Sequence, residues 1–373
     1  MNEDRATRYH RSRRRTALAS AAVGVALLAV LAFSGRSRDL AEWASAAAAP
    51  IGRPFSSASA VALYVIVLAV GWELLSFPFE FYRTFLLDRR YGLTSEPVSA
   101  WLIDHVKALA LGLAFTLGAA LAVFGAIHLS PSWWWLIATG GFVVAVVAIA
   151  GIAPIWLMPI FYRFRPLDRE PLRDRLVALS TRAGVRVLGA FEWGLGEKTS
   201  RANAALVGAG RTRRILVSDT MLKDYSDDEI EVILAHELAH HVHHDIWTTL
   251  ALETVLVATA LYGAHLAATF GSATLGFAGP TDMAAAPLMI LAAGAVSLLL
   301  APLSNAWSRR NERRADRFAL QMTERSTAFV SAMKRLGAQN LAEERPSRLV
   351  YWFFHTHPTI EQRISAARAA SES

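Results

Sequence analysis

The chain has 373 residues, of which 54% are hydrophobic and only 18% are charged. Soluble proteins average about 25% charged residues, and disordered segments are poor in apolar residues. The composition therefore excludes disorder for most of the chain and indicates a membrane protein. Because there is no cysteine, disulfides, cysteine-ligated zinc, iron–sulfur clusters and thiol nucleophiles are excluded.

The formal net charge is +7, and the first 15 residues carry six arginines against Glu3 and Asp4. A basic cluster can bind nucleic acid, but this one directly precedes an apolar stretch. A cytoplasmic anchor beside anionic lipid is the simpler interpretation. We expect 1–15 to be a basic cytoplasmic N-terminus that contacts the bilayer and no nucleic acid.

Six stretches are apolar and long enough to cross a bilayer, which takes about 20 residues. The first, 16–35, is predicted to be an uncleaved signal anchor rather than a secretory signal peptide. The small-residue run at 44–49 lies too far beyond its apolar core to be a cleavage region. The other spans are expected at about 57–77, 108–128, 133–158, 246–270 and 284–306.

Lysine and arginine gather on alternate connections between these spans, as the positive-inside rule requires. Only the first outer loop, which contains Arg36, Arg38 and Arg53, departs from that pattern. We expect an integral multi-pass protein of the cell membrane (plasma or inner), with both termini and the polar segments on the cytoplasmic side.

Two polar segments remain, at 163–245 and 307–373. The first is predicted to be α+β. It contains an amphipathic helix at about 170–183 and three strand-like runs. These runs are 185–193, 203–207 and 214–219, of which the last two are joined by a glycine-bearing hairpin at 208–213.

A metal-binding pattern follows these strands. Ser226 and Glu229 form a capping-box signature that predicts the start of a helix. The helix continues into His236-Glu237-Leu238-Ala239-His240, an HExxH motif. Helical spacing puts His236 and His240 one turn apart on one face, where both can bind one zinc ion, and Glu237 can hydrogen-bond a water there.

Three more histidines follow the motif, at positions 241, 243 and 244. For His241, His243 and His244 we favour solvated or pH-sensing roles at a membrane interface. Loose metal binding by a histidine-rich tract is the lesser alternative.

A catalytic zinc site needs a third protein ligand and leaves a fourth position open. The candidate is Glu312, which follows the last span. Asp316 lies one helical turn further on the same face, where it can orient a ligating histidine. On spacing alone, a basic juxtamembrane helix with compensating acids explains this stretch equally well.

HExxH with a distant Glu-x-x-x-Asp resembles the gluzincin membrane metallopeptidases, which include CAAX prenyl protease type 1 and, more distantly, the HtpX-like heat-shock protease. Three further segments match the CAAX pattern over about residues 60–370. They are Tyr91-Gly92, Asn203-Ala204 before the hairpin, and His357-Pro358 followed by Arg363.

The resemblance implies a role for each matching residue. His236, His240 and Glu312 would bind one zinc ion, Glu237 would be the general base, and Asp316 would support a ligand. His357 would hold the substrate carbonyl or the developing oxyanion, Arg363 would brace the site, and the strand at Asn203 and Ala204 would lie along the substrate backbone. Without the resemblance, His357 is better explained as a capping or packing residue. One departure is His241, where the eukaryotic pattern has an aromatic residue.

The family also implies a membrane-enclosed chamber around the zinc ion. Such a chamber would explain Glu73 and Glu253, which lie near or within predicted spans, because intramembrane acids usually face a wet interior. Snorkelling of these two side chains to the interface is the alternative.

We therefore expect a mainly α, polytopic membrane protein with about six transmembrane helices and a small α+β gluzincin-type zinc peptidase domain on the cytoplasmic side. The membrane domain would be 16–162, with four spans, and the metallopeptidase domain 163–373, interrupted by two. The expected activity is zinc-dependent hydrolysis of peptide bonds in membrane-associated proteins, such as prenylated or misfolded ones. The alternative is a non-catalytic scaffold or transporter whose zinc site is structural or absent, although a structural zinc site has no need of Glu237.

Overall fold

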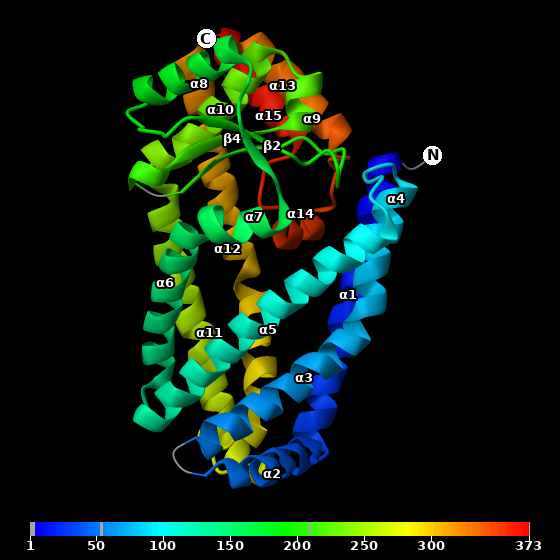
Figure 1. Ribbon diagram of the computed structural model, residues 1–373, viewed down its shortest axis with the longest axis vertical. Helices are drawn as coiled ribbons and strands as arrows, with labels where there is room; N and C mark the ends of the chain where they lie inside the picture. The colour runs from blue at the N-terminus through cyan, green and yellow to red at the C-terminus, as the bar shows by residue number, and fades with distance from the viewer. Residues whose placement is uncertain (1–3, 53–54, 209, 373) are drawn as a thin grey trace.

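The computed structural model describes residues 4–52, 55–208 and 210–372. Figure 1 shows long helices at one end of the molecule and, at the other, a small sheet surrounded by shorter helices. The two chain termini lie at the sheet-bearing end. We call the sheet and the shorter helices around it the polar part.

Six long helices in the described residues are apolar enough to cross a membrane, as the sequence predicted. They are α1 (Arg5–Phe33), α3 (Ser56–Phe81), α5 (Val98–Leu129), α6 (Trp134–Ile152), α11 (Asp245–Leu275) and α12 (Ala286–Thr323). α3 continues through a π-helical turn into α4 (Leu87–Arg90), and α6 continues in the same way into α7 (Met158–Phe161).

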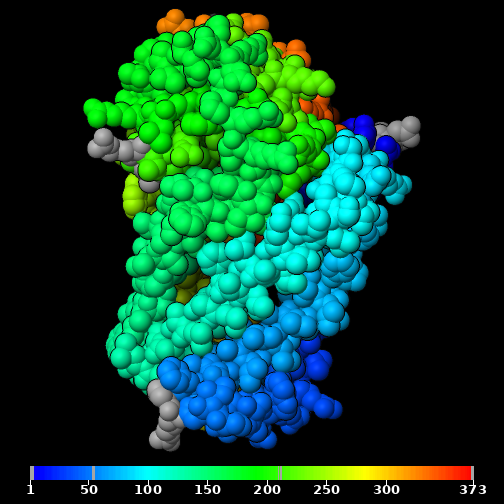
Figure 2. Space-filling view, in the orientation of Figure 1, coloured from blue at the N-terminus to red at the C-terminus, as the bar shows by residue number. Residues whose placement is uncertain are grey.

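The outer surfaces of these helices carry large apolar side chains. Leu299 and Leu74 are 76% and 72% exposed, which in water would be unfavourable but in lipid needs no partner. On the face shown in Figure 2, an opening beside α5 leaves helices at the back of the molecule visible. The long helices therefore present a lipid-facing exterior with gaps between some of them.

The connection between α1 and α3 contains a helix that the sequence did not predict, α2 (Arg36–Ala48). It lies across the ends of the long helices farthest from the polar part (Figure 1). Arg38 donates to the carbonyl oxygens of Leu275 and Gly276, at 2.9 and 3.0 Å. A cation at the negative end of α11 is favourable, and this contact gives Arg38 a structural role at that end of the molecule.

The polar part contains a four-stranded sheet in the order β1-β2-β4-β3. Its strands are β1 (Phe164–Pro166), β2 (Ala190–Trp193), β3 (Ala204–Val207) and β4 (Arg214–Ser218). β2 and β4 are parallel, while β1–β2 and β3–β4 are antiparallel. β3 is therefore an edge strand that pairs with β4 as the hairpin prediction expects, although residue 209 of their connection lies outside the described residues. β1 is a short strand that the sequence did not predict.

The strand predicted over 185–193 begins only at Ala190. Its first residues instead complete the cap of α8 (Glu170–Arg182). Gly184, with φ +72°, donates to the carbonyl of Thr181, and Val185 donates to that of Ser180. This is the Schellman arrangement, which uses residues that look strand-like because they are apolar.

Four further helices of the polar part pack around one hydrophobic core. They are α9 (Asp219–Asp224), α10 (Asp227–Val242), α13 (Ser326–Gln339) and α15 (Ile360–Glu372), whereas α14 (Arg348–Phe354) packs against α12. Ile230 and Leu234 of α10 pack in this core with Ile215 of β4 and Phe329 of α13, all completely buried. α10 is therefore held on its apolar side, and its polar side faces α12.

The N-terminal turns of α1 dock on the polar part. His10 Nε2 lies 2.7 Å from the carbonyl oxygen of Leu341, and Arg14 forms an ion pair with the buried Glu343. The basic N-terminus therefore also forms part of the wall around the site described below.

Candidate metal centre

The N-terminal cap of α10 is the predicted capping box. Ser226 Oγ accepts from the N–H of Glu229, and Glu229 Oε2 accepts from the N–H of Ser226 at 2.8 Å. Glu229 Oε1 also accepts from Ser331 and Arg335 of α13. Burial alone would raise the pKa of Glu229, but these hydrogen bonds and the Arg335 charge hold it below its ordinary value. The start of α10 is thus fixed by local and long-range contacts.

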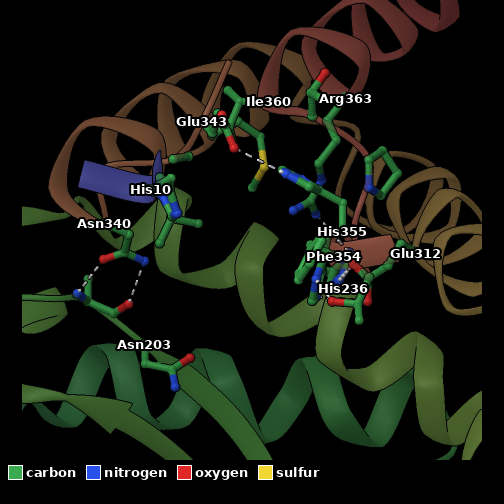
Figure 3. Close-up of a pocket in the computed structure, with 18 of the residues that line it drawn as sticks. His10, Asn203, His236, Glu312, Asn340, Glu343, Phe354, His355, Ile360 and Arg363 are labelled. Atoms are coloured by element: carbon green, nitrogen blue, oxygen red, sulfur yellow. Dashed lines mark hydrogen bonds and ion pairs between the residues drawn. The ribbon is translucent and has the colours of Figure 1, made fainter. Parts of the chain in front are cut away.

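Three predicted ligands meet at the polar side of α10. His236 and His240 lie one turn apart, and Glu312 comes from the end of α12 beyond its apolar section. Ligand atoms of the three residues lie within 4.8 Å of one another. His236 Nε2 is 3.2 Å from Glu312 Oε2, and His240 Nε2 is 3.5 Å from Glu312 Oε1. Figure 3 shows His236 and Glu312 facing each other from these two helices.

The other ring nitrogen of each histidine is held by a carboxylate. His236 Nδ1 lies 2.9 Å from Asp316 Oδ1, as expected for the predicted supporting acid. His240 Nδ1 lies 2.8 Å from Asp245 Oδ2, a contact that the sequence analysis missed. A carboxylate on Nδ1 fixes the tautomer and turns Nε2 toward the metal, so both Nε2 atoms are oriented toward Glu312.

Arg363 of α15 braces this arrangement. Its Nε and Nη2 donate to the two carboxylate oxygens of Asp316 at 2.9 and 2.5 Å. The Nη2 atom is also 3.3 Å from His236 Nδ1. Bidentate arginine–carboxylate pairs fix geometry as well as charge, so Arg363 holds the acid that orients His236.

The cluster fits a metal ion by its chemistry as well as its spacing. Glu312 Oε2 is buried and makes no hydrogen bond within the described chain. An unsatisfied buried carboxylate oxygen is unfavourable by several kcal/mol, and a cation between it and the two imidazoles would remove that penalty. Two imidazole nitrogens and one carboxylate oxygen are the ligand set of a catalytic zinc site with one open position.

Glu237 and His357 line a cavity of about 640 Å³ next to the cluster. Burial raises the pKa of Glu237 above its ordinary value, and its carboxylate makes no hydrogen bond to another described residue. His357 is 60% exposed and its Nε2 lies 3.3 Å from Glu312 Oε1, so it reaches the cluster from the C-terminal segment. Both predicted catalytic side chains are therefore next to the three ligands.

Asn203 and Ala204, the predicted substrate-binding residues, line the same cavity. The carbonyl of Asn203 accepts from the N–H of Ser218 at 2.9 Å, which places Asn203 in the ladder with β4. The cavity is also lined by residues from the membrane part and α13 that the sequence analysis did not single out. They include His10, Arg14, Arg83 and Asn340.

The other histidines of the tract lie outside the cluster. His241 Nε2 lies 3.4 Å from the carbonyl oxygen of Leu206, and the ring of His243 packs edge-on against Phe318. His244 takes the left-handed conformation, with φ 56°, in the turn between α10 and α11.

The two intramembrane acids each contact a polar side chain of a neighbouring helix. Glu73 of α3 lies 2.7 Å from His105 Nε2 of α5. Glu253 of α11 accepts from Ser304 of α12 at 2.5 Å. Such pairing satisfies polar groups within a bilayer.

The sequence profile of Peptidase family M48 matches residues 166–371, which contain all of these candidate ligands. The chain belongs to Peptidase family M48. The profile of the CAAX prenyl protease N-terminal region, with five membrane helices, matches residues 2–163. This M48 protein is accordingly a membrane metalloprotease, a hydrolase.

Several relatives of this M48 protein are known. YhfN of Bacillus subtilis, described as an uncharacterized metalloprotease, is 28% identical over 347 residues, which cover 91% of this chain and 79% of YhfN. CAAX prenyl protease 1 of Saccharomyces cerevisiae is 28% identical over 320 residues, 80% of this chain and 70% of the yeast protein. The crystal structure of Ste24p from S. mikatae superposes with a TM-score of 0.83 at 20% identity, over 97% of this chain and 88% of that one. The M48 protein therefore shares the Ste24p fold.

Proposed function

We propose that this protein is a zinc-dependent endopeptidase in which His236, His240 and Glu312 hold one zinc ion. The observation that carries the proposal is the convergence of both Nε2 atoms on a buried carboxylate whose Oε2 has no hydrogen-bond partner. When bound, zinc supplies Lewis acidity that polarises the scissile carbonyl and lowers the pKa of water toward about 7.

The remaining steps belong to side chains around the cavity. Glu237 accepts the proton of the attacking water and delivers it to the leaving amine. His357 donates a hydrogen bond to the oxygen on which negative charge develops, a role that typically contributes about 3–4 kcal/mol. Asp316 and Arg363 keep His236 in place, and the free edge of β3 receives the substrate as an extended strand.

The proposed substrates are membrane-associated proteins, including prenylated or misfolded ones. The cavity that contains Glu237 and His357 is also lined by Arg14 of α1 and by Arg83, which follows α3. A peptide in this cavity therefore lies beside the ends of membrane helices, so its neighbouring sequence can remain in or on the bilayer. The likeness to a yeast CAAX prenyl protease supports prenylated substrates in particular.

We further propose that the peptidase domain and both termini are cytoplasmic, in the cell membrane. Both termini lie at the sheet-bearing end of the molecule (Figure 1), which agrees with an even number of crossings. The basic residues of 1–15 are at that end as well, as the positive-inside rule favours.

Hydrolysis by the purified protein tests this proposal. Detergent-purified protein should contain about one zinc ion per chain and cut a prenylated peptide, an unprenylated copy or an unfolded protein. Chelation should abolish cleavage, and added zinc should restore it. Stoichiometric zinc without cleavage of any of the three substrates would favour the scaffold or transporter alternative.

A further inference from the structure

The free edge of β3 offers few groups to a substrate backbone. In an antiparallel pair, residues alternate between those bonded to the partner strand and those whose N–H and C=O point away. Asn203 is bonded to Ser218 of β4 through its carbonyl oxygen and its N–H. The alternation therefore turns the backbone groups of Ala202, Ala204 and Leu206 toward the free edge, on the side of the cavity.

At Ala202 this edge is already occupied. Asn340 Oδ1 accepts from the N–H of Ala202 at 3.2 Å, and Asn340 Nδ2 donates to its carbonyl oxygen at 3.3 Å. Figure 3 shows both bonds on the segment that leads to Asn203. The amide thus imitates one residue of an added strand. Asn340 is itself fixed as the C-cap of α13, where its N–H bonds to the carbonyl of Leu336.

At Leu206 the carbonyl oxygen is also occupied. His241 Nε2 lies 3.4 Å from it, and with its proton on Nε2 the ring donates to that oxygen. His241 is the residue after the HExxH motif, so its position is set by α10. Ala204 lies between these two capped residues. Its N–H donates to no described side chain, and its carbonyl oxygen accepts from none.

We infer that Asn340 and His241 limit the free edge of β3 to one open acceptor, the carbonyl of Ala204, and so fix the register of a bound peptide. Only one substrate N–H can then bond to this strand, whichever way the peptide runs. In a sheet, a register slip moves the peptide by two residues before the same face is restored. Because the carbonyl oxygens of Ala202 and Leu206 are already occupied, a shifted peptide finds no free acceptor there. A single peptide bond of the substrate is therefore presented to Glu237. This inference rests on the proposed peptidase function.

Backbone N-methylation tests the inference by binding alone. A 12-residue unstructured peptide is methylated at one backbone nitrogen at a time, and its affinity for the zinc-loaded, inactive Glu237→Gln protein is measured by fluorescence anisotropy. One position should weaken binding about fivefold or more, as expected for a lost hydrogen bond. The positions two residues to either side should have little effect.

The capping side chains of Asn340 and His241 are then removed, one at a time, in the Glu237→Gln protein. Asn340→Ala should create a second sensitive position two residues from the first, and His241→Ala should create one on the opposite side. Gln339→Ala is the matched control, because Gln339 bonds to the neighbouring Ser200 carbonyl but not to the edge groups of β3. It should keep a single sensitive position, and thermal unfolding should show that all variants are folded.

Several sensitive positions in the parent, a single unchanged position in both capping variants, or no peptide binding at all would overturn the inference. Cleavage by the protein with Glu237 intact is measured separately. Cleavage without the one-position pattern would refute the register inference alone, and the pattern without cleavage would refute the peptidase proposal alone.

Discussion

Each candidate zinc-binding histidine has its own carboxylate on Nδ1. Asp316 of α12 contacts His236, and Asp245 at the start of α11 contacts His240. Asp245 also pairs with Arg314, as Asp316 pairs with Arg363. Each of the two histidines is therefore oriented by an acid that is itself paired with an arginine of another helix, Arg314 of α12 for Asp245 and Arg363 of α15 for Asp316.

Replacing Asp245 should weaken the metal site without removing a ligand. In Asp245→Asn, the tautomer and orientation of His240 are less well defined, and zinc affinity should fall about 10–100-fold. Competition with a chromogenic chelator measures this. Asp174→Asn, at an exposed position on α8, is the control, and an Asp245→Asn affinity within twofold of that control would contradict the role.

Glu229 gives a pH-dependent contribution to stability. Its pKa is held below its ordinary value of 4.5, so the contribution is present above that value and is lost as the pH falls through the lower, folded-state pKa. Glu229→Gln should destabilise the protein at pH 7 by about 2 kcal/mol, since it weakens buried, charge-assisted hydrogen bonds. Thermal unfolding from pH 7 to pH 4 should show a constant difference that narrows only below about pH 4.5. A stability difference between the two proteins that grows as the pH falls would contradict a lowered pKa for Glu229 in the folded protein.

At the scale of residues, helical spacing in the sequence predicts which side chains lie close together. The 3.6-residue period of a helix is enough to place His236 beside His240 and Asp316 beside Glu312. Asp245 follows a turn in which His244 has φ 56°, a conformation that no sequence pattern here signals. Asn340 lies 138 residues from Ala202, so only the packing of α13 on the sheet brings them together.

At the scale of elements, the centre depends on how α11 and α12 pack. α11 begins with Asp245, and α12 carries Glu312 and Asp316 on its polar end. The helices approach closely at Gly263, where a Cβ atom would lie 2.9 Å from Val296 Cγ2. Small residues allow such close approach between membrane helices.

Gly263→Ala should therefore push the two helices apart. The β-branched Val296 has little rotamer freedom in a helix, so the clash should destabilise the protein by about 1–3 kcal/mol. Scanning fluorimetry in detergent measures the loss. Gly112→Ala in α5 is the control, because a Cβ there would meet no described atom within 4 Å beyond its chain neighbours and its own helix backbone. Equal unfolding temperatures for the two variants would contradict tight packing at Gly263.

Helices and strands were predicted well where amino-acid composition determines them. They were predicted less well where a few specific contacts determine them. The six spans follow from length and hydropathy alone. The structure of α2 depends on contacts such as Ser37 with Tyr64 and with the carbonyl of Ala284, each at 2.6 Å. β1 has only three residues, and pairing with β2 rather than any internal pattern defines it.

At the scale of the whole molecule, the chain joins the sheet-bearing polar part to the ends of the long apolar helices (Figure 1). α1 contributes to both, since its apolar part is a candidate span and its first turns bond to Leu341 and Glu343 of the polar part. The cavity beside the candidate metal centre is consequently lined by residues from both parts of the chain. A soluble peptide and a membrane-tethered one would meet the same candidate catalytic groups.

The absence of cysteine makes the proposed orientation directly measurable. Asp174→Cys and Ser132→Cys introduce single thiols at exposed positions, one on α8 and one in the connection between α5 and α6. A membrane-impermeant maleimide should label Ser132→Cys in intact cells and Asp174→Cys only after permeabilisation. The opposite pattern would place the peptidase domain outside the cell.

The most direct test is to measure zinc content and peptide cleavage for the wild-type protein and for its Glu237→Gln variant. Because Glu237 is not a ligand, both proteins should hold about one zinc ion per chain, and the variant should lose cleavage by at least about 100-fold. A variant that binds zinc normally and still cuts at the original rate would contradict the assignment of Glu237 as the base, and active protein free of zinc would contradict the metal centre itself.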